Sequence, residues 1–219
     1  MKQLTRLETV IPGLRATTPE PLPFATSLHV RAFVLERDRG NILVYSTTGL
    51  EADAAAIEDL GGISRHYLNH RHEAMFASDA VQAPLFVHEN ERDPVERTYH
   101  VRGTFSRRHL LDDDFEVIPT PGHTSGATAY LWDSGGHRAL FTGDTIFLSD
   151  GEWVAAVLEG SSDRASYLDS LGLIRELEFD VLVPWAASAG EPYHAVVSHA
   201  EAQRRIDAII ERVGRGEPR

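Results

Sequence analysis

The sequence contains no cysteine among its 219 residues. Disulfide bonds and thiolate metal sites are therefore excluded, and any metal ion would need nitrogen and oxygen ligands. Basic residues are also scarce, because 21 Lys and Arg stand against 33 Asp and Glu, for a formal net charge of −12. Phosphate binding requires clustered Lys and Arg, so this balance argues against nucleic acid as a partner.

Long apolar runs are missing as well. No stretch of 18 consecutive apolar residues occurs, so the sequence predicts no membrane-spanning helix and no membrane partner. The N-terminal residues lack the apolar core of a signal peptide, which leads us to expect a cytoplasmic protein. The length and the 42% share of hydrophobic residues suffice for one core, and we expect a single domain over residues 1–219.

Short β-rich segments make up most of the chain. We expect strands at 28–35, 41–45, 63–69, 84–88, 105–108, 115–120, 127–132, 139–142 and 180–183. Helices are expected at 51–60, at 163–176 with Ser162 or Asp163 as its cap, and at 198–213. The last one opens on the capping-box pattern Ser198–Glu201. Strand clusters broken by helices predict an α+β fold with packed sheets and helices outside them.

Histidine and aspartate residues follow three of the expected strands. His70 and His72 are two positions apart, so in extended chain they would point to the same side. His123 stands in a Pro-Gly turn, and Asp144 is the first carboxylate after the strand 139–142. Each segment alone is also compatible with an exposed loop histidine or an ordinary cap. Together they place four candidate metal ligands just beyond strand ends, where sheet scaffolds present functional groups.

Two of these segments have a specific family pattern. Residues 121–126 read Pro-Gly-His-Thr-Ser-Gly, and residues 141–147 read Phe-Thr-Gly-Asp-Thr-Ile-Phe. Both resemble motifs of the metallo-β-lactamase superfamily, which includes glyoxalase II-like hydrolases, and the resemblance covers most of the chain. It implies an αββα sandwich of two mixed β-sheets flanked by helices, with a metal site that acts on a small-molecule substrate.

The chain departs from this family at three positions. The leading motif H-x-H-x-D-H reads His-Arg-His-Glu-Ala-Met here, so Ala74 and Met75 replace its Asp and last His. A late histidine of the family is replaced by Ala186. The resemblance implies that these three positions would serve a second ion, whereas His70, His72, His123 and Asp144 serve the first. We therefore predict one divalent ion, with Zn²⁺ favoured.

Three histidines around Zn²⁺ leave a position at which a water molecule can be activated. Asp144 is either a fourth ligand or the group that orients and deprotonates this water. Glu73 is the second candidate base, because it lies beside the histidine pair. The sequence thus predicts a metal-dependent hydrolase with a mononuclear site.

Two alternatives stay open. His70, His123 and Asp144 match the two-histidine, one-carboxylate pattern of mononuclear Fe(II) oxygenases, which would make the protein an iron redox enzyme. A third histidine within reach makes that arrangement less natural.

The other alternative is a protein without catalysis that binds a metal or ligand on the same fold. Ala74, Met75 and Ala186 would make the emptied half-site apolar, as in a ligand pocket. Trp185 and His194 are candidate pocket residues, since Trp185 precedes Ala186 and the loop carrying His194 could fold back toward it.

Overall fold

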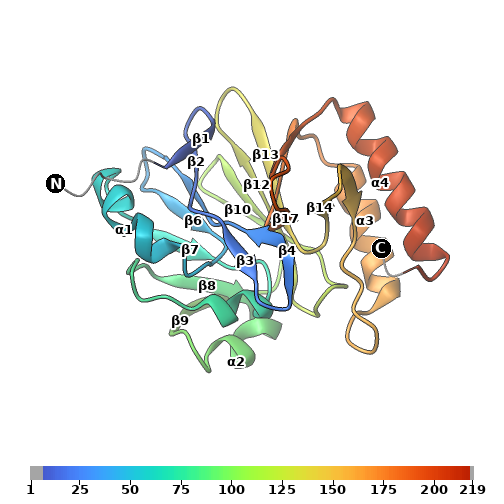
Figure 1. Ribbon diagram of the computed structural model, residues 1–219, viewed down its shortest axis with the longest axis horizontal. Coiled ribbons are helices and arrows are strands. Elements are labelled where there is room, and N and C mark those ends of the chain that lie inside the picture. Colours follow the sequence, from blue (N-terminus) through green and yellow to red (C-terminus); the bar gives the residue numbers. More distant parts are fainter. Residues whose placement is uncertain (1–6, 218–219) are drawn as a thin grey trace.

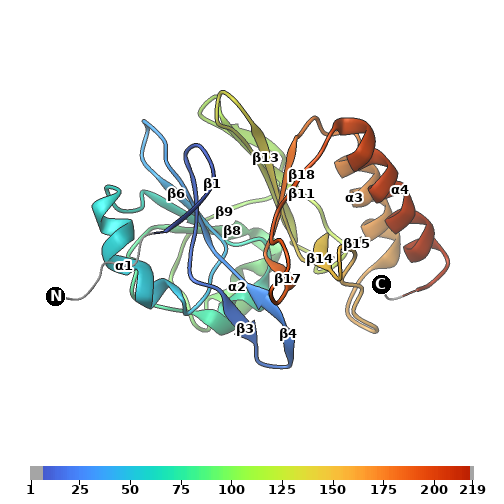
Figure 2. The ribbon, with the colours of Figure 1, turned by 45° about the horizontal axis from the view of Figure 1, so that its top comes forward.

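The computed structural model describes residues 7–217. Two large β-sheets face each other, and helices cover their outer faces (Figures 1 and 2). Helix α1 (Leu50–Asp59) lies on one side, and α3 (Arg164–Arg175) and α4 (His199–Gly214) lie together on the other. The predicted α+β class with αββα layering is therefore confirmed.

The first sheet joins an antiparallel half to a parallel half. In spatial order its strands are β1 (Glu8–Ile11), β2 (Leu14–Ala16), β5 (Phe33–Leu35), β6 (Ile42–Val44), β7 (Arg65–Tyr67), β8 (Leu85–His88) and β9 (Val101–Phe105). Pairing is antiparallel from β1 to β6 and parallel from β6 to β9. Parallel neighbours need a crossover, and α1 supplies it between β6 and β7. The predicted helix 51–60 is confirmed.

The second sheet is a meander extended by two later strands. Its order is β10 (His109–Leu111), β11 (Phe115–Pro119), β12 (Thr128–Asp133), β13 (Arg138–Gly143), β16 (Val181–Pro184) and β18 (Ala195–Val196). Strands β10 to β13 are antiparallel, and β16 runs parallel to β13 after the crossover through α3. Asp163 and Ser198 cap α3 and α4 with their side chains, as the sequence predicted.

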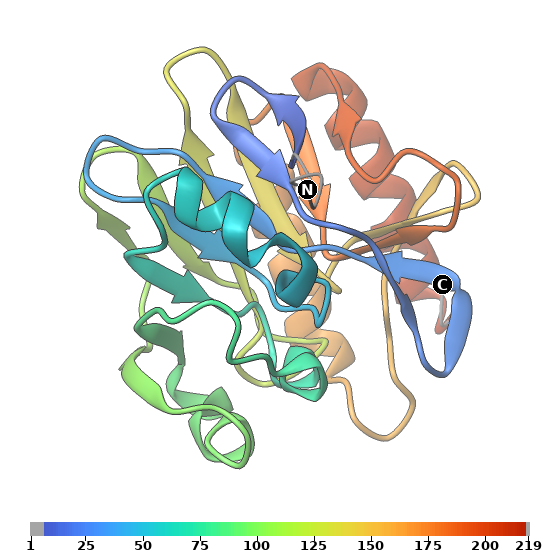
Figure 3. The ribbon, with the colours of Figure 1, turned by 60° about the vertical axis from the view of Figure 1, so that its left-hand side comes forward.

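A smaller sheet lies where the two large ones meet. Its order is β15 (Glu152–Val154), β14 (Phe147–Ser149), β17 (Ala186–Ser188), β4 (Ala25–Val30) and β3 (Glu20–Leu22). The β3–β4 hairpin, drawn in blue, projects from the body of the molecule (Figures 2 and 3). Short helical turns follow β7 and β8, namely η1 (Arg71–Phe76), η2 (Glu89–Glu91) and α2 (Arg92–Val95).

Two of the expected strands were placed wrongly. The segment 28–35 is divided, because β4 ends at Val30 and β5 begins at Phe33 in a different sheet. The strand expected at 105–108 is β9, which ends at Phe105. Hydrophobic composition alone did not reveal either break.

Aromatic side chains fill the space between the large sheets. Phe33 of β5 and Phe141 of β13 are fully buried, with ring centroids 6.0 Å apart. The Tyr45 hydroxyl, also buried, donates to the Val183 carbonyl at 2.8 Å and accepts from the Gly143 amide at 2.8 Å. This contact fixes the end of β13 against the first sheet. Asp144 is the next residue after this strand.

Candidate metal centre

His70 and His72 enter the site from the turn after β7. His70 has extended backbone angles, but residues Arg71–Phe76 form the 3₁₀ helix η1. The expectation that the two histidines share one face of an extended strand is therefore wrong. They converge because the chain turns tightly between them, which leaves their ring centroids 5.0 Å apart.

His123 is positioned by a loop that packs against α3. Gly122 has a φ of +144°, and a Cβ added there would lie 2.4 Å from the Cα of Tyr167. Only glycine fits this close approach. The Ser170 hydroxyl donates to the Pro121 carbonyl at 2.6 Å and holds the same loop.

Asp144 follows β13 through Gly143, whose φ is +55°. A Cβ at Gly143 would overlap the side chain of Asn69, so the end of β13 and the start of the histidine segment touch directly. The backbone carbonyl of Asp144 accepts a hydrogen bond from the Tyr167 hydroxyl at 3.0 Å. The backbone that bears the Asp144 carboxylate is thus held by Asn69 on one side and by Tyr167 on the other.

The three histidine rings form a compact cluster. One nitrogen of each of His70, His72 and His123 lies within 4.8 Å of the other two. The Nδ1 of His72 is 3.1 Å from the Nε2 of His123. Ligands at 2.0–2.1 Å from a tetrahedral ion lie about 3.3 Å from one another, so this spacing suits such an ion. The Nε2 of His70 is buried and has no hydrogen-bond partner among residues 7–217.

Asp144 lies at the edge of this cluster. Its Oδ2 is 3.5 Å from the Nε2 of His70 and 3.7 Å from the Nε2 of His123. The donor set of three imidazoles and one carboxylate is typical of zinc sites with nitrogen and oxygen ligands. The structure therefore brings together all four residues that the sequence selected as candidate ligands.

Hydrogen bonds to the outer ring nitrogens set the tautomers. The Nδ1 of His70 is 2.9 Å from the Asn69 amide oxygen, and the Nδ1 of His123 is 2.7 Å from the Ala156 carbonyl. Since these oxygens only accept, each Nδ1 carries a proton, and Nε2 is the nitrogen of each ring that is left to bind a metal ion. This is the arrangement that orients metal-ligating histidines.

Charge is distributed unequally over the cluster. Burial opposes protonation of His70, but Asp144 and Glu73 outweigh it and raise the pKa to about 10. Burial and the neighbouring His70 and His123 lower the pKa of His72 to about 4. Burial raises the pKa of Asp144, but His70 and the other two rings lower it more strongly. The carboxylate therefore stays charged, and a cation at the cluster would face a negative group.

Glu73 lies beneath the histidines and is completely buried. Its Oε1 accepts from the amides of Asn69 at 2.7 Å and His70 at 3.1 Å, and its Oε2 accepts from the Ser46 amide at 3.1 Å. Oε1 is also 3.3 Å from the Nδ1 of His70. Burial raises the pKa of Glu73, against the effect of His70. The carboxylate is directed at the backbone behind the cluster.

A pocket of about 530 Å³ opens beside the histidines. His72, His123 and Asp144 line it, together with Trp185 and several apolar side chains. The Trp185 indole donates to the Ser46 carbonyl at 3.0 Å, and its ring centroid is 5.4 Å from that of His70.

The three residues that depart from the family pattern lie in two different places. Met75 and Ala186 line the pocket. Ala74 instead packs with Leu68 and Val95 in a small apolar cluster. His194 lines another depression of about 260 Å³, with Trp153 and Arg205, so the structure does not bring it to the histidines.

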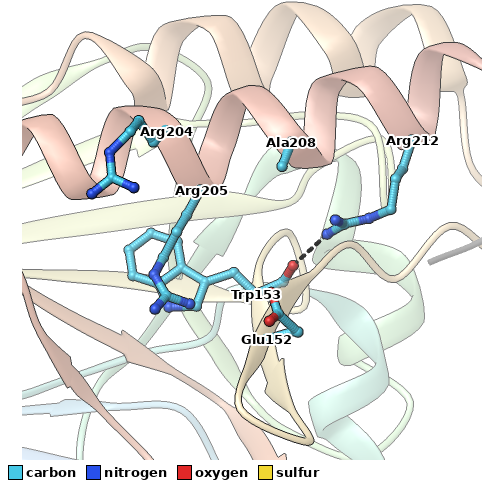
Figure 4. A pocket seen from close by; sticks show the side chains of 6 residues that line it. All are labelled: Glu152, Trp153, Arg204, Arg205, Ala208 and Arg212. Carbon is cyan, nitrogen blue, oxygen red and sulfur yellow. Dashed lines mark hydrogen bonds between the residues drawn. The ribbon is translucent and has the colours of Figure 1, made fainter.

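A depression of about 180 Å³ lies between α4 and the β14–β15 hairpin (Figure 4). Arg212 donates to the Trp153 carbonyl at 2.6 Å, and the Arg205 guanidinium lies over the Trp153 ring at 5.7 Å. Arg204 and Arg205 also pair with Glu201. Arg205 and Arg212 therefore fasten α4 to the hairpin, whereas Arg204 pairs within the helix.

A comparison with known families identifies the class of protein. The model of the metallo-beta-lactamase superfamily matches residues 52–186, which is more than half of the chain. The chain therefore belongs to the metallo-beta-lactamase superfamily, as the motifs around His123 and Asp144 indicated.

In amino-acid sequence, the chain is similar to hydroxyacylglutathione hydrolase of Xanthomonas axonopodis pv. citri (strain 306). The two are 37% identical over 127 residues, which is 55% of this chain and 45% of that protein. It is also similar to the uncharacterized protein YmaE of Bacillus subtilis (strain 168), at 29% identity over 106 residues, 45% of this chain and 39% of that protein. The chain thus spans less than half of the length of these relatives.

Solved structures share the fold. A metallo-beta-lactamase from Pontibacter korlensis superposes with a TM-score of 0.70 at 14% identity, covering 95% of this chain and 98% of that one. ETHE1 from Myxococcus xanthus gives a TM-score of 0.60 at 17% identity, with 90% and 89% covered. At these identities the likeness shows the fold alone. No helix within residues 7–217 has both the length and the apolar character needed to cross a bilayer.

Proposed function

We propose that the chain is a metal-dependent hydrolase with a single divalent ion, most simply Zn²⁺, held by His70, His72 and His123. Proteins of this superfamily generally bind divalent metals such as zinc. The observation that carries the proposal is the spacing of the three ring nitrogens, all within 4.8 Å of one another. The hydrogen bonds of His70 and His123 support it, because each Nδ1 donates to an oxygen behind the cluster and each Nε2 is directed inward.

The residues at the second position support one ion rather than two. Ala74, Met75 and Ala186 offer no imidazole or carboxylate, and the thioether of Met75 is a soft donor suited to copper. His194 could have supplied a replacement ligand, but it lines a different depression.

The protein's own groups would handle the proton. A bound Zn²⁺ supplies Lewis acidity, which lowers the pKa of a coordinated water molecule to about 7. Asp144, at 17% side-chain exposure and beside both Nε2 atoms, would ligate or accept the proton of the nucleophilic water. Glu73 was the second candidate base. Because its oxygens accept from backbone amides, we assign it a positioning role for His70 instead.

The proposed substrate is a small molecule with a hydrolysable bond. The similarity to a hydroxyacylglutathione hydrolase supports a hydrolytic reaction, and the 530 Å³ pocket suits a small ligand.

Hydrolysis can be tested with esters, thioesters, lactams and phosphodiesters. The full-length protein should hydrolyse at least one class, and His123→Ala should reduce kcat/KM by at least a hundredfold. The matched control is His109→Ala, since His109 is exposed on β10 and lies outside the cluster. Equal activity in the two variants would contradict the proposal, and activity supported by iron in a redox assay would favour the oxygenase alternative.

A further inference from the structure

Exposed large apolar side chains gather at the mouth of the histidine pocket. Within residues 7–217 the large hydrophobic residues that are exposed are Phe24, Met75, Leu110, Leu158 and Val196. Phe24 (73% exposed), Met75 (51%) and Leu158 (40%) all line this one pocket. Single exposed apolar residues are ordinary, but a group of them around one opening is typical of a binding surface.

These three residues come from separate parts of the chain. Phe24 lies at the turn of the projecting β3–β4 hairpin (Figure 3), Met75 lies in η1, and Leu158 lies in the loop between β15 and α3. Deeper in the pocket, Leu28, Phe147 and Trp185 continue the apolar wall. No single element explains the cluster through its own amphipathic pattern, so the shared feature is the pocket itself.

Charge is almost absent from this wall. None of the lining residues is Lys or Arg, and Asp144 is the charged side chain next to the histidines. Outside the cluster itself, an anionic group on a ligand would lose its hydration without gaining a cation. An uncharged apolar group would lose no favourable hydration and would gain free energy by burying its own surface.

The departures from the family pattern contribute directly to this wall. Met75 and Ala186 occupy two of the positions at which the resemblance implies second-ion ligands, and both line the pocket. The small Ala186 side chain leaves room that an imidazole would fill. The same substitutions that remove a second metal site therefore extend the apolar pocket toward His72 and His123.

We infer that this pocket binds an uncharged, apolar acyl or alkyl chain of the substrate and so directs the adjoining ester-type bond to the histidine cluster. The reaction at that bond rests on the proposed function, but the binding of the chain does not. A volume of about 530 Å³ lies within the range of small-molecule pockets, roughly 300–1,000 Å³.

The test is an isothermal calorimetric titration of the full-length protein with 1-butanol, 1-hexanol and 1-octanol. A chelator is present throughout, so that no ligand binds through a metal ion. Affinity should rise about three- to fourfold for each added methylene. Octanoate should bind at least tenfold more weakly than 1-octanol.

Variants at the rim locate the binding. Phe24→Ser and Met75→Ser should each weaken 1-octanol binding at least threefold, and their exposure makes loss of folding unexpected. Leu110→Ser is the matched control, because Leu110 is 62% exposed but lies outside the pocket. Its affinity should equal that of the parent protein.

Three results would overturn the inference: affinity that does not depend on chain length, octanoate binding as tightly as 1-octanol, or equal weakening by Leu110→Ser. Because binding is measured without metal or turnover, the two proposals fail separately. A protein that binds alkanols but hydrolyses nothing contradicts the proposed function alone. A metal-dependent hydrolase without chain-length dependence contradicts the pocket assignment alone.

Discussion

At the scale of single residues, the buried Glu73 carboxylate is the group that most directly supports the histidine cluster. It accepts from the consecutive amides of Asn69 and His70, just before η1, and lies beside the outer nitrogen of His70. Partners of this kind fix ring orientation, and their removal from metal sites typically lowers affinity 10- to 100-fold. Glu73 would therefore act on a bound metal ion through His70.

Glu73→Gln should raise the dissociation constant for Zn²⁺ at least tenfold. The amide keeps the size of the carboxylate but removes its charge and one acceptor oxygen. Competition with a chromophoric chelator measures the affinity, and circular dichroism checks that the variant is folded. Glu96→Gln, at an exposed position, should bind zinc like the parent protein; equal affinities in both variants would contradict the role given to Glu73.

His66 is a second buried residue with a measurable consequence. It lies away from the cluster, and its Nε2 is 2.8 Å from the Tyr45 carbonyl. Burial lowers its pKa from 6.5 to about 4, so it stays neutral in the folded protein while the unfolded chain gains a proton below pH 6.5. The contribution of His66 to the free energy of unfolding is therefore fully present above pH 6.5, and it is lost as the pH falls from 6.5 toward 4.

The loss linked to His66 should amount to about 3 kcal/mol between pH 7 and pH 4. Urea denaturation at several pH values measures the free energy of unfolding. His66→Gln lacks the titrating group, so its free energy of unfolding should decline less steeply over this range. Parallel pH curves for the two proteins would show that His66 does not titrate as its burial implies.

At the scale of elements, the loop after β11 depends on its contact with α3. Gly122 approaches the backbone of Tyr167 so closely that any Cβ must displace the loop or the helix. His123 is the next residue, so such a displacement moves a candidate ligand. Helix α3 thus contributes to the site without supplying a side chain to the cluster.

Gly122→Ala should destabilise the protein by several kcal/mol more than Gly135→Ala and should weaken zinc binding. Both glycines have positive φ angles, so both alanines carry backbone strain on the order of 1–3 kcal/mol. An added Cβ meets nothing within 4 Å at Gly135 but lies 2.4 Å from Tyr167 at Gly122. Thermal denaturation and a zinc titration compare the pair, and equal behaviour would refute the proposed packing constraint.

At the scale of the whole molecule, the expected elements predicted packed sheets with helices outside them, and the family resemblance implied the αββα layering. The start of helix α4 was predicted from Ser198 and Glu201, because a capping box is a local sequence signal, and the Ser198 hydroxyl does accept from the Glu201 amide. The smaller sheet was not foreseen. Strands such as β3 and β17 have three residues each, too few for an alternating pattern to stand out.

The candidate ligands, like the start of α4, were predictable from local signals in the sequence. Each follows a strand end and carries a distinctive residue type, so His123 and Asp144 could be selected without knowing the path between them. The pocket was not predictable in full, since Phe24 and Leu158 reach it from segments without any motif. Contacts between distant loops depend on the packed fold, and a single sequence holds no direct record of them.

The central claim is one divalent ion at His70, His72 and His123, and metal stoichiometry tests it most directly. Protein purified without added metal and then dialysed against excess Zn²⁺ should contain one equivalent by elemental analysis. His123→Ala should contain well below half an equivalent, and His109→Ala should match the parent. Two equivalents in the parent protein, or one equivalent retained in His123→Ala, would contradict the account.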